Sequence, residues 1–411
     1  MPRVLLLLPT TTYKTPDFLA AAAKLGVDVT VASEEPSAVE GLNPGGLLTL
    51  DFLDPAAAAR DAIAFARTHP LEAVVGVDED TALVAAVIAR AIGLPHNPVH
   101  AAVAARHKAT MRRLLSEAAV PSPGFLVFDR DEDPDESAAA VRFPCVLKPT
   151  FLAASRGVIR ADDPQEFADA WRRIAKILSQ PAVAARGGEA AREILVEDFV
   201  PGREVALEGL LRGGELKVLA LFDKPDPLEG PFFEETIYVT PSRLPGETQD
   251  RIGRVASHGA LALGLRDGPV HAELRIDGSR PWLIEMAARS IGGLCSRTLR
   301  FGTGMSLEEL ILRHALRMDM PEPERERRAA GVMMIPIPKA GVLEEVRCLE
   351  EARATADVED ITISAHIGQR LVPLPEGSRY LGFIFSRSAT PERAEAALRE
   401  AHALLRFRIG V

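Results

Sequence analysis

Two runs of residues joined by a short turn constrain the fold of this chain most strongly. Residues 271–276 and 282–289 alternate apolar and charged side chains or are largely apolar, and the turn Asp277-Gly278-Ser279 separates them. This pattern predicts an antiparallel β-hairpin. Glu273 and Glu285 would then lie on neighbouring strands and face the same cavity.

The chemistry of these two carboxylates favours a metal and phosphate site. Hard oxygen ligands suit Mg²⁺, which keeps its remaining positions for water and phosphate oxygens. Arg289 follows the second run, so it can reach an anion held by the metal. The alternative is a surface hairpin with an incidental ion pair. The apolar neighbours argue instead for a buried hairpin whose charges must be compensated: Leu274, Ile276, Leu283 and Ile284.

A lysine and a loop of small residues upstream have the pattern of a phosphate-binding segment. Residues 143–149 form a short apolar run that contains Lys148 near its end, and residues 153–158 follow as the loop. A lysine at a strand end can neutralise nucleotide phosphates while backbone N–H groups surround them. The pattern of residues 193–204 predicts a strand followed by an extended segment. The free backbone donors and acceptors of that segment can bind an adenine edge.

In their order along the chain, these stretches resemble the ATP-grasp superfamily. The resemblance is closest to carboxylate–amine ligases of the L-amino-acid ligase and biotin carboxylase type. It implies a fold with α/β and α+β parts: an N-terminal parallel α/β domain, a two-lobed ATP-grasp domain and a small α+β C-terminal domain. The residues that carry it are Lys108, Lys148 with its loop, residues 197–200, Glu204, Glu273, Glu285 and Arg289.

The resemblance also implies roles for individual residues. Glu273 and Glu285 would bind Mg²⁺, with Mn²⁺ as the alternative metal. Adenine would contact Glu197 and the backbone through Val200, and ribose would contact Glu204. The full set of implied ATP contacts is Lys108, Lys148, Ser155, Gly157, Glu197, Phe199, Val200 and Glu204.

Two departures from the superfamily pattern affect this site. The superfamily usually carries an asparagine two residues after the second glutamate, where this chain has Ala287, so one metal ligand is missing or is supplied by another residue. The phosphate loop usually carries several glycines, but residues 151–157 keep only Gly157. Gly157 is therefore the expected point of close backbone approach. Arg156 either adds charge to the phosphates or is solvated.

An aromatic-rich extended segment is expected beside the second substrate. Lys224 ends one predicted strand, and residues 231–241 return as an extended run. By resemblance to the amino-acid ligases, Glu235 would hold an α-ammonium group and Lys224 would contact the nucleotide or an acyl phosphate. The alternative is an ion pair between Lys224 and Glu235 that closes a hairpin. The other expected substrate contacts are Tyr238, Ser290, Gly292 and Gly293.

Periodicity divides the chain into three predicted domains. Apolar runs alternate with helical segments over residues 1–105, which indicates a parallel sheet. Residues 106–320 would form the ATP-grasp domain, with a small mobile lobe over about 122–200, and residues 330–411 a C-terminal α+β domain. The loop 9–16 follows the first strand, where α/β sheets bind ligands, but a plain polar connection is favoured. Asp78-Glu79-Asp80 begins a predicted helix, where acidic residues need no further function.

Composition limits the partners of this chain. A net charge of −10 without a basic tract argues against nucleic acid. The longest apolar run, residues 4–8, is too short to span a bilayer and is not followed by a signal-peptide cleavage pattern. Cys145, Cys295 and Cys348 lack metal-binding spacing, which fits reduced thiols in a cytoplasmic protein, and Cys295 could line the substrate site. The expected partners are small carboxylate and amine substrates, with a homodimer left open.

The expected reaction follows from the poor leaving group of a carboxylate. Transfer of the γ-phosphoryl group of ATP gives an acyl phosphate, and an amine then displaces phosphate to give an amide and ADP. Arg289 and the Gly292-Gly293 backbone would stabilise the oxyanion of the intermediate. The rivals are a bicarbonate-using carboxylase, a non-catalytic ATP-binding module and a nicotinamide-dependent dehydrogenase. The last is disfavoured because no glycine-rich fingerprint follows residues 4–8.

Overall fold

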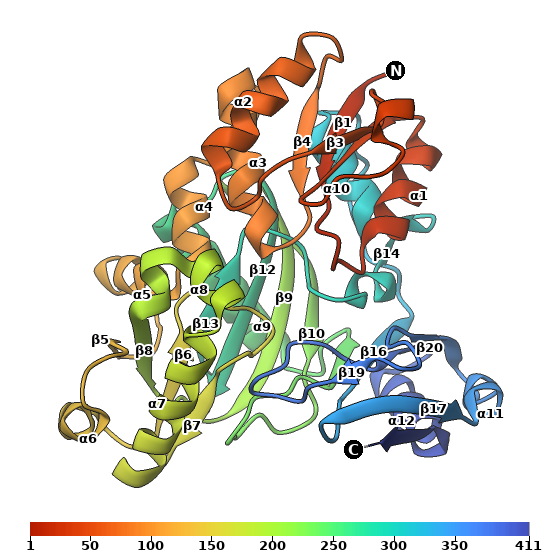
Figure 1. Cartoon of the computed structure of the whole chain (residues 1–411). Coiled ribbons are helices and arrows are strands. Elements are labelled where there is room, and N and C mark those ends of the chain that lie inside the picture. Colours follow the sequence, from red (N-terminus) through yellow and green to blue (C-terminus); the bar gives the residue numbers. More distant parts are fainter. Residues whose placement is uncertain (411) are drawn as a thin grey trace.

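The computed structural model describes residues 1–410, and its N-terminal part is a parallel sheet between helices (Figure 1). Alternate residues of the first strand enter two different cores, Val4 and Leu6 one of them, Leu5 and Leu7 the other. A strand buried on both faces has the continuous apolar run found here. The strand order is β3-β2-β1-β4. The elements are β1 (Arg3–Leu7), α1 (Thr15–Leu25), β2 (Asp28–Ser33), η1 (Glu40–Leu42), β3 (Leu47–Thr49), α2 (Pro55–Ala66), β4 (Ala73–Gly76) and α3 (Glu79–Ile92).

An antiparallel sheet with the order β5-β8-β6-β7 forms the small lobe, at the lower left of Figure 1. Helix α7 (Pro164–Leu178) covers it and buries Phe167, Trp171 and Ile174, which lie on one helical face. Residues 181–192 form α8 (Pro181–Gly187) and η3 (Gly188–Arg192). The other elements are β5 (Phe125–Asp129), α6 (Pro134–Ser137), η2 (Ala138–Ala140), β6 (Cys145–Pro149), β7 (Ile159–Ala161) and β8 (Glu193–Asp198).

The predicted hairpin forms one edge of a large sheet whose order is β13-β12-β9-β10-β11-β16-β20-β18. Strands β12 (Gly268–Asp277) and β13 (Arg280–Ala287) are antiparallel, and Glu273 lies directly opposite Glu285. One face of this sheet packs against helices through residues such as Leu274, Met111 and Ile252. The strands and helices of this region are α4 (Val99–Arg106), α5 (Lys108–Glu117), β9 (Arg203–Arg212), β10 (Glu215–Asp223), β11 (Ile237–Thr240) and α9 (Gly246–Leu263).

The large sheet continues into the C-terminal part of the chain, because β11 pairs with β16 (Ala329–Ile335). Three strands of the predicted C-terminal domain, β16, β20 and β18, are therefore part of the large sheet, and a domain boundary at 320–330 stays a prediction. A small sheet of order β19-β17-β21 completes this part. Its elements are β17 (Gly341–Arg347), α11 (Leu349–Arg353), β18 (Val358–Ile363), β19 (Arg370–Leu371), β20 (Gly382–Ser388), α12 (Pro391–Leu404) and β21 (Arg406–Gly410).

The segment between the hairpin and β16 packs under the N-terminal sheet. Leu310 and Ile311 of its helix share a core with Phe18 of α1 and Leu6 of β1. Within residues 1–410, no helix combines the length and the apolar character needed to cross a membrane. The elements of the segment are η4 (Cys295–Thr298), β14 (Arg300–Phe301), β15 (Met305–Ser306) and α10 (Leu307–Ala315).

Candidate functional site

A cavity of about 370 Å³ lies where the N-terminal sheet, the small lobe and the large sheet meet. The carboxyl ends of β1 and β4 open onto it, as expected for a ligand site of a parallel sheet. Interpreting the loop 9–16 as a plain polar connection is therefore wrong, because four of its residues line the cavity: Pro9, Thr11, Thr12 and Tyr13.

One face of the large sheet supplies the charged wall of this cavity. Side chains alternate between the two faces of a strand, so Leu274 enters the core while Glu273 and Arg275 point to the cavity. The antiparallel pairing of β9 with β12 places Glu204 opposite Arg275 and Glu208 opposite His271. Charged residues up to 71 positions apart in the sequence, Glu204 and Arg275, are thereby gathered on one surface.

Two predicted phosphate-binding lysines stand at the small-lobe end of the cavity. The ammonium of Lys108 donates to the carbonyl oxygen of Leu152 at 2.9 Å and lies 3.1 Å from Oε1 of Glu285. The ammonium of Lys148 lies 2.7 Å from Oε2 of Glu197. Both side chains are buried and line the cavity, and each cation is held by a carboxylate that also lines it, Glu285 on the large sheet and Glu197 on the small-lobe sheet.

Arg112 completes this arrangement and was missed by the sequence analysis. It follows Lys108 by one turn of α5, its Nε donates to Oε1 of Glu197 at 2.6 Å, and its Nη2 donates to the carbonyl oxygen of Ile284. Burial alone would raise the pKa of Glu197, but Arg112 and Lys148 hold it below its usual value. The i, i+4 spacing from Lys108 was a usable signal, although nothing local shows that the arginine is buried.

Packing within the small lobe accounts for the single glycine of the phosphate loop. Gly157 has φ +75°, and a Cβ there would lie 2.8 Å from Cγ of Pro149. Its N–H donates to the carbonyl oxygen of Pro375 at 2.9 Å. The expected backbone approach of Gly157 to a phosphate is thus still a prediction. Ser155 and Arg156 both line the cavity, and Arg156 also donates to Gln180 at 2.7 Å.

The segment expected to hold adenine and ribose also lines the cavity. The Arg160 and Arg275 guanidinium groups lie 4.1 and 4.9 Å from the ring centre of Phe199. Val200 is buried at the cavity wall. Glu204 accepts from the ammonium of Lys224 at 2.7 Å, so its carboxylate is engaged before any ribose is present.

Lys224 lies at the centre of a cluster of three carboxylates. Its ammonium is 2.7 Å from Glu204, 3.1 Å from Glu273 and in closer contact with Glu235. The interpretation of Lys224 and Glu235 as an ion pair is confirmed, and the pair extends to two further acids. Burial, together with the neighbouring Glu273, raises the pKa of Glu235 to about 7. The carboxylates hold the pKa of Lys224 well above its usual value, against the effect of burial.

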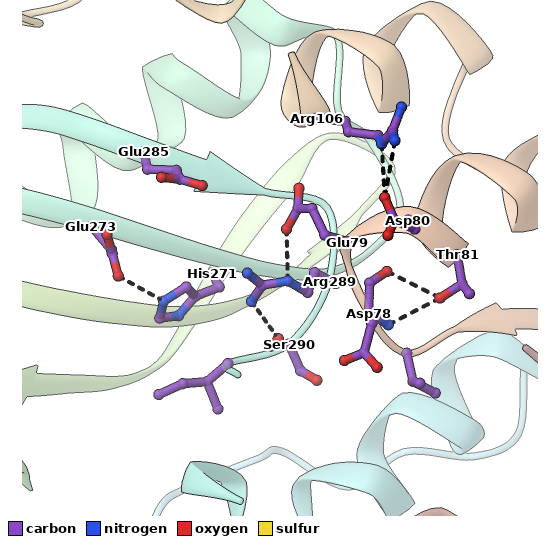
Figure 2. Close-up of polar contacts among 12 residues, drawn as sticks. Asp78, Glu79, Asp80, Thr81, Arg106, His271, Glu273, Glu285, Arg289 and Ser290 are labelled. Atoms are coloured by element: carbon purple, nitrogen blue, oxygen red, sulfur yellow. Dashed lines mark hydrogen bonds and ion pairs between the residues drawn. The ribbon is translucent and has the colours of Figure 1, made fainter. Parts of the chain in front are cut away.

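Arg289 projects into the cavity from the end of β13 and pairs with the N-terminal part (Figure 2). Its Nε donates to Oε2 of Glu79 at 2.8 Å, and its Nη1 donates to the carbonyl oxygen of Ser290 at 3.0 Å. Figure 2 also shows Glu79 beside Asp78 at the start of α3. Treating these acids as only helix-terminal charges was wrong, because Glu79 fixes the guanidinium of the predicted catalytic arginine.

Known proteins share this arrangement of parts. An ATP-grasp domain matches residues 141–298, an ATP-grasp N-terminal domain matches 19–96, and an L-amino acid ligase C-terminal domain matches 333–410. The chain belongs to the ATP-grasp superfamily. Its fold is similar to the crystal structure of an L-amino acid ligase from Bacillus licheniformis, with a TM-score of 0.85 and 27% identity over 100% of this chain and 99% of that one.

Curated relatives of this ATP-grasp chain are similar over only part of their length. Alanine–anticapsin ligase of Bacillus subtilis (strain 168) is 29% identical over 234 residues, which are 54% of this chain and 49% of the relative. Carnosine synthase 1 of Homo sapiens is 27% identical over 62% of this chain and 32% of the relative. A biotin carboxylase domain from Hydrogenobacter thermophilus, at 14% identity and a TM-score of 0.69, is similar in fold.

The donor set of this ATP-grasp site fits a divalent cation. Glu273 and Glu285 are partly buried, lie opposite each other and offer hard oxygen ligands. In the structure each of them contacts a lysine, Lys224 or Lys108, at 3.1 Å. Oxygen atoms of Glu204 and Glu235 lie within 4.8 Å of Glu273. These four partly buried acids outnumber the two lysines that contact them, and such a set of oxygen donors suits a divalent cation.

A polar side chain lines the cavity next to Ala287, the position at which the superfamily usually has asparagine. Ala287 lies opposite His271 in the hairpin, and His271 lines the cavity. The His271 ring lies 3.2 Å from Glu208 through Nδ1 and 3.6 Å from Glu273 through Nε2. The sequence analysis gave His271 no role. Its position two residues before Glu273 on the same strand would have placed both side chains on one face of the sheet.

The substrate side of the cavity combines predicted residues with ones the sequence did not indicate. Tyr238, Gly292 and Gly293 line it as expected. Ser290 instead accepts a hydrogen bond from Lys14 at 3.3 Å, and Lys14 is buried. Gly293 is required by packing, since a Cβ there would lie 2.9 Å from the Phe383 ring. Cys295, which the sequence allowed as a lining residue, also lines the cavity, and the residues that the sequence did not indicate are Met334, Ser378 and Tyr380.

Proposed function

We propose that this chain is an ADP-forming ligase that joins a small carboxylate, such as that of an amino acid, to an amine through an acyl phosphate. The observation that carries the proposal is the single cavity into which both acids of the hairpin, two lysines and Arg289 project. The ligases named among its relatives support it. The chain spans about half or less of the length of alanine–anticapsin ligase and of carnosine synthase 1. The activity and substrates of the whole protein are therefore part of the proposal.

In the first step, a carboxylate oxygen of the donor attacks the γ-phosphorus of ATP and ADP leaves. Lys108 and Lys148 neutralise the phosphate oxygens, and Glu273 and Glu285 would hold the metal. Mg²⁺, or Mn²⁺ in its place, supplies charge neutralisation of the transferring group when bound. The order of the lysines and acids along the cavity favours nucleotide binding at the small-lobe end.

In the second step, the free amine attacks the carbonyl carbon of the acyl phosphate, phosphate leaves and the nitrogen loses a proton. Arg289 is the cation suited to the developing oxyanion, since Glu79 and the Ser290 carbonyl fix its orientation before reaction. Glu235 is our candidate for the α-ammonium contact. It lies beside Tyr238 on the substrate side, and Lys224 would shift toward the acyl phosphate.

A non-catalytic ATP-binding module is the second candidate, favoured by Ala287 at the usual asparagine position. It would bind Mg·ATP and release no phosphate with any acid and amine. The bicarbonate-using carboxylases among the structural neighbours are similar in fold alone, and bicarbonate-dependent ADP formation would identify that activity.

The test is phosphate release by the purified chain with ATP, Mg²⁺ and pooled amino acids, with a parallel reaction that contains bicarbonate instead. We expect release with amino acids and its loss in Glu285→Gln. Glu247→Gln, an exposed acid at the start of α9, is the matched control. Binding of Mg·ATP without release in any reaction would favour the non-catalytic module.

Two further properties belong to the proposal. The three free cysteines favour a reducing compartment such as the cytoplasm, which fractionation of the source cell tests. A homodimer would resemble the dimer named for the biotin carboxylase domain, and sedimentation of the purified chain tests it.

A further inference from the structure

Residues 372–380, called here the bridging segment, connect β19 to β20 and reach from the C-terminal part toward the small lobe (Figure 1). Ser378 and Tyr380 at its end line the substrate side of the cavity. Tyr380 packs against Phe383, with ring centres 6.1 Å apart, and Phe383 also contacts Tyr13 of the N-terminal loop. The end of the segment is therefore fixed beside the substrate pocket.

The middle of the bridging segment is attached to the small lobe at two points, Pro375 and Glu376. The carbonyl oxygen of Pro375 accepts the N–H of Gly157 at 2.9 Å. The carboxylate of Glu376 accepts two hydrogen bonds from Arg173 of α7, at 2.5 and 2.9 Å. These hydrogen bonds hold the pKa of Glu376 below its usual value. The phosphate loop and the helix behind it are thus both tied to one segment.

The shape of the segment makes this attachment stiff. The N–H of Gly377 donates to the carbonyl oxygen of Pro373 at 2.8 Å. A Cβ on Gly377 would lie 1.9 Å from the carbonyl oxygen of Val372, so the turn closes on itself. Two prolines in 372–376 restrict the backbone further. A displacement at Pro375 is therefore transmitted to Gly157.

Arg173 also contacts a second segment beside the substrate. Its guanidinium lies 4.9 Å from the ring centre of Phe232, and Phe232 forms a β-bridge with Ile159 of β7. The next residue, Phe233, lines the cavity. Arg173 is therefore a small-lobe residue whose side chain contacts both segments that border the substrate pocket.

We propose that Arg173 and Glu376 are positioning residues, through which the bridging segment holds the phosphate loop in its nucleotide-binding position. The proposal deepens the proposed function and rests on it, because it assigns nucleotide binding to that loop. Neither residue touches the reacting atoms. Their effect is exerted on Gly157 and on residues 153–156, which line the cavity.

The experiment compares Glu376→Gln, Arg173→Gln and the double variant with the full-length wild type. The probe is Mg·ADP, and its affinity is measured by titration calorimetry. We expect each single variant to bind about threefold to fivefold more weakly, as for loss of a partly exposed ion pair. The double variant should match Arg173→Gln, because all three variants lose the ion pair and both variants at position 173 also lose the contact with Phe232. Arg172→Gln is the control, since Arg172 pairs with Asp169 and Asp135 inside the small lobe.

Two further readouts separate positioning from a general loss of stability. The amide of Gly157 should exchange faster in Glu376→Gln while the free energy of unfolding stays close to wild type. In the phosphate-release assay, KM for ATP should rise by the same factor as the ADP dissociation constant and kcat should stay unchanged. A lower kcat with an unchanged KM would contradict the positioning role.

The outcomes distinguish this proposal from the proposed function. Failure of the wild type to bind Mg·ADP overturns the proposed function and the positioning role together. Wild-type binding with unchanged affinity in Glu376→Gln overturns the positioning role alone. Additive losses in the double variant would also overturn it, because Arg173 and Glu376 would then act separately.

Discussion

Replacement of Arg112 by methionine should show how strongly a buried cation supports the nucleotide end of the cavity. Arg112 is 1% exposed and its Nε lies 2.6 Å from Glu197. Removal of one partner from a buried ion pair costs about 3–5 kcal/mol when the remaining charge has no other partner. Here Lys148 remains 2.7 Å from Glu197, which reduces that cost, whereas the lost bond to Ile284 adds about 1 kcal/mol. We expect a total loss of about 2–4 kcal/mol in unfolding free energy.

The loss of unfolding free energy in Arg112→Met should depend on pH in a direction that the pKa of Glu197 determines. In the wild type the pKa of Glu197 is below its usual value, so its contribution to stability is complete above the unfolded pKa and is lost as pH falls through the folded one. Arg112→Met removes one of the two cations that lower the pKa of Glu197, so burial raises that pKa above its wild-type value. The folded variant then binds its proton at higher pH than the wild type does. The destabilisation should therefore be largest near pH 7 and should shrink toward pH 4.

The assay is urea unfolding at several pH values, together with Mg·ADP affinity. Arg113→Met, which changes the exposed neighbour on α5, is the control. Arg112→Met with Glu197→Gln should lose less than the sum of the two single variants, because the partners are in contact. Nucleotide affinity should fall, because Lys148 is drawn more strongly to Glu197. A variant within about 0.5 kcal/mol of wild type at pH 7, the range of ordinary surface changes, would refute the reasoning.

Three further outcomes are expected. Glu273→Gln and Glu285→Gln should abolish phosphate release with the fold nearly intact, since each exchange keeps volume and removes charge; normal turnover in Glu285→Gln would exclude the hairpin from the mechanism. Arg289→Lys should lower kcat by about 10²-fold or more with little change in ATP affinity; the reverse pattern would assign Arg289 to the nucleotide. Gly157→Ala should cost about 2 kcal/mol, from strain at φ +75° and the contact with Pro149. The control is Gly26→Ala, where φ is +63° and no atom lies within 4 Å of the added Cβ; it should cost about 1 kcal/mol of unfolding free energy. Equal losses in the two variants would show that Pro149 moves to make room for the added Cβ.

The sequence by itself determined the local elements that carry the chemistry. The period of two around the turn 277–279 is enough to place Glu273 opposite Glu285, because register follows from alternation and turn position. Apolar residues recur at helical spacing in 164–178, and these residues form α7 with Phe167, Trp171 and Ile174 on its buried face. The order of lysines and acids along the chain also indicated the superfamily. These features depend on neighbours in sequence, where periodicity and turn chemistry are informative.

The tertiary structure alone decided which charges meet. Arg289 pairs with Glu79, 210 positions away, and Lys14 reaches Ser290 across 276 positions. Burial of Arg112 depends on how α5 packs against β13, and the bond from Gly157 to Pro375 depends on the large sheet continuing into the C-terminal part. No local pattern encodes such contacts, because loop closure and packing set them after the elements have formed. For that reason the sequence identified the hairpin and its acids, while the partners of Arg289, Lys224 and Gly157 emerged only from the folded chain.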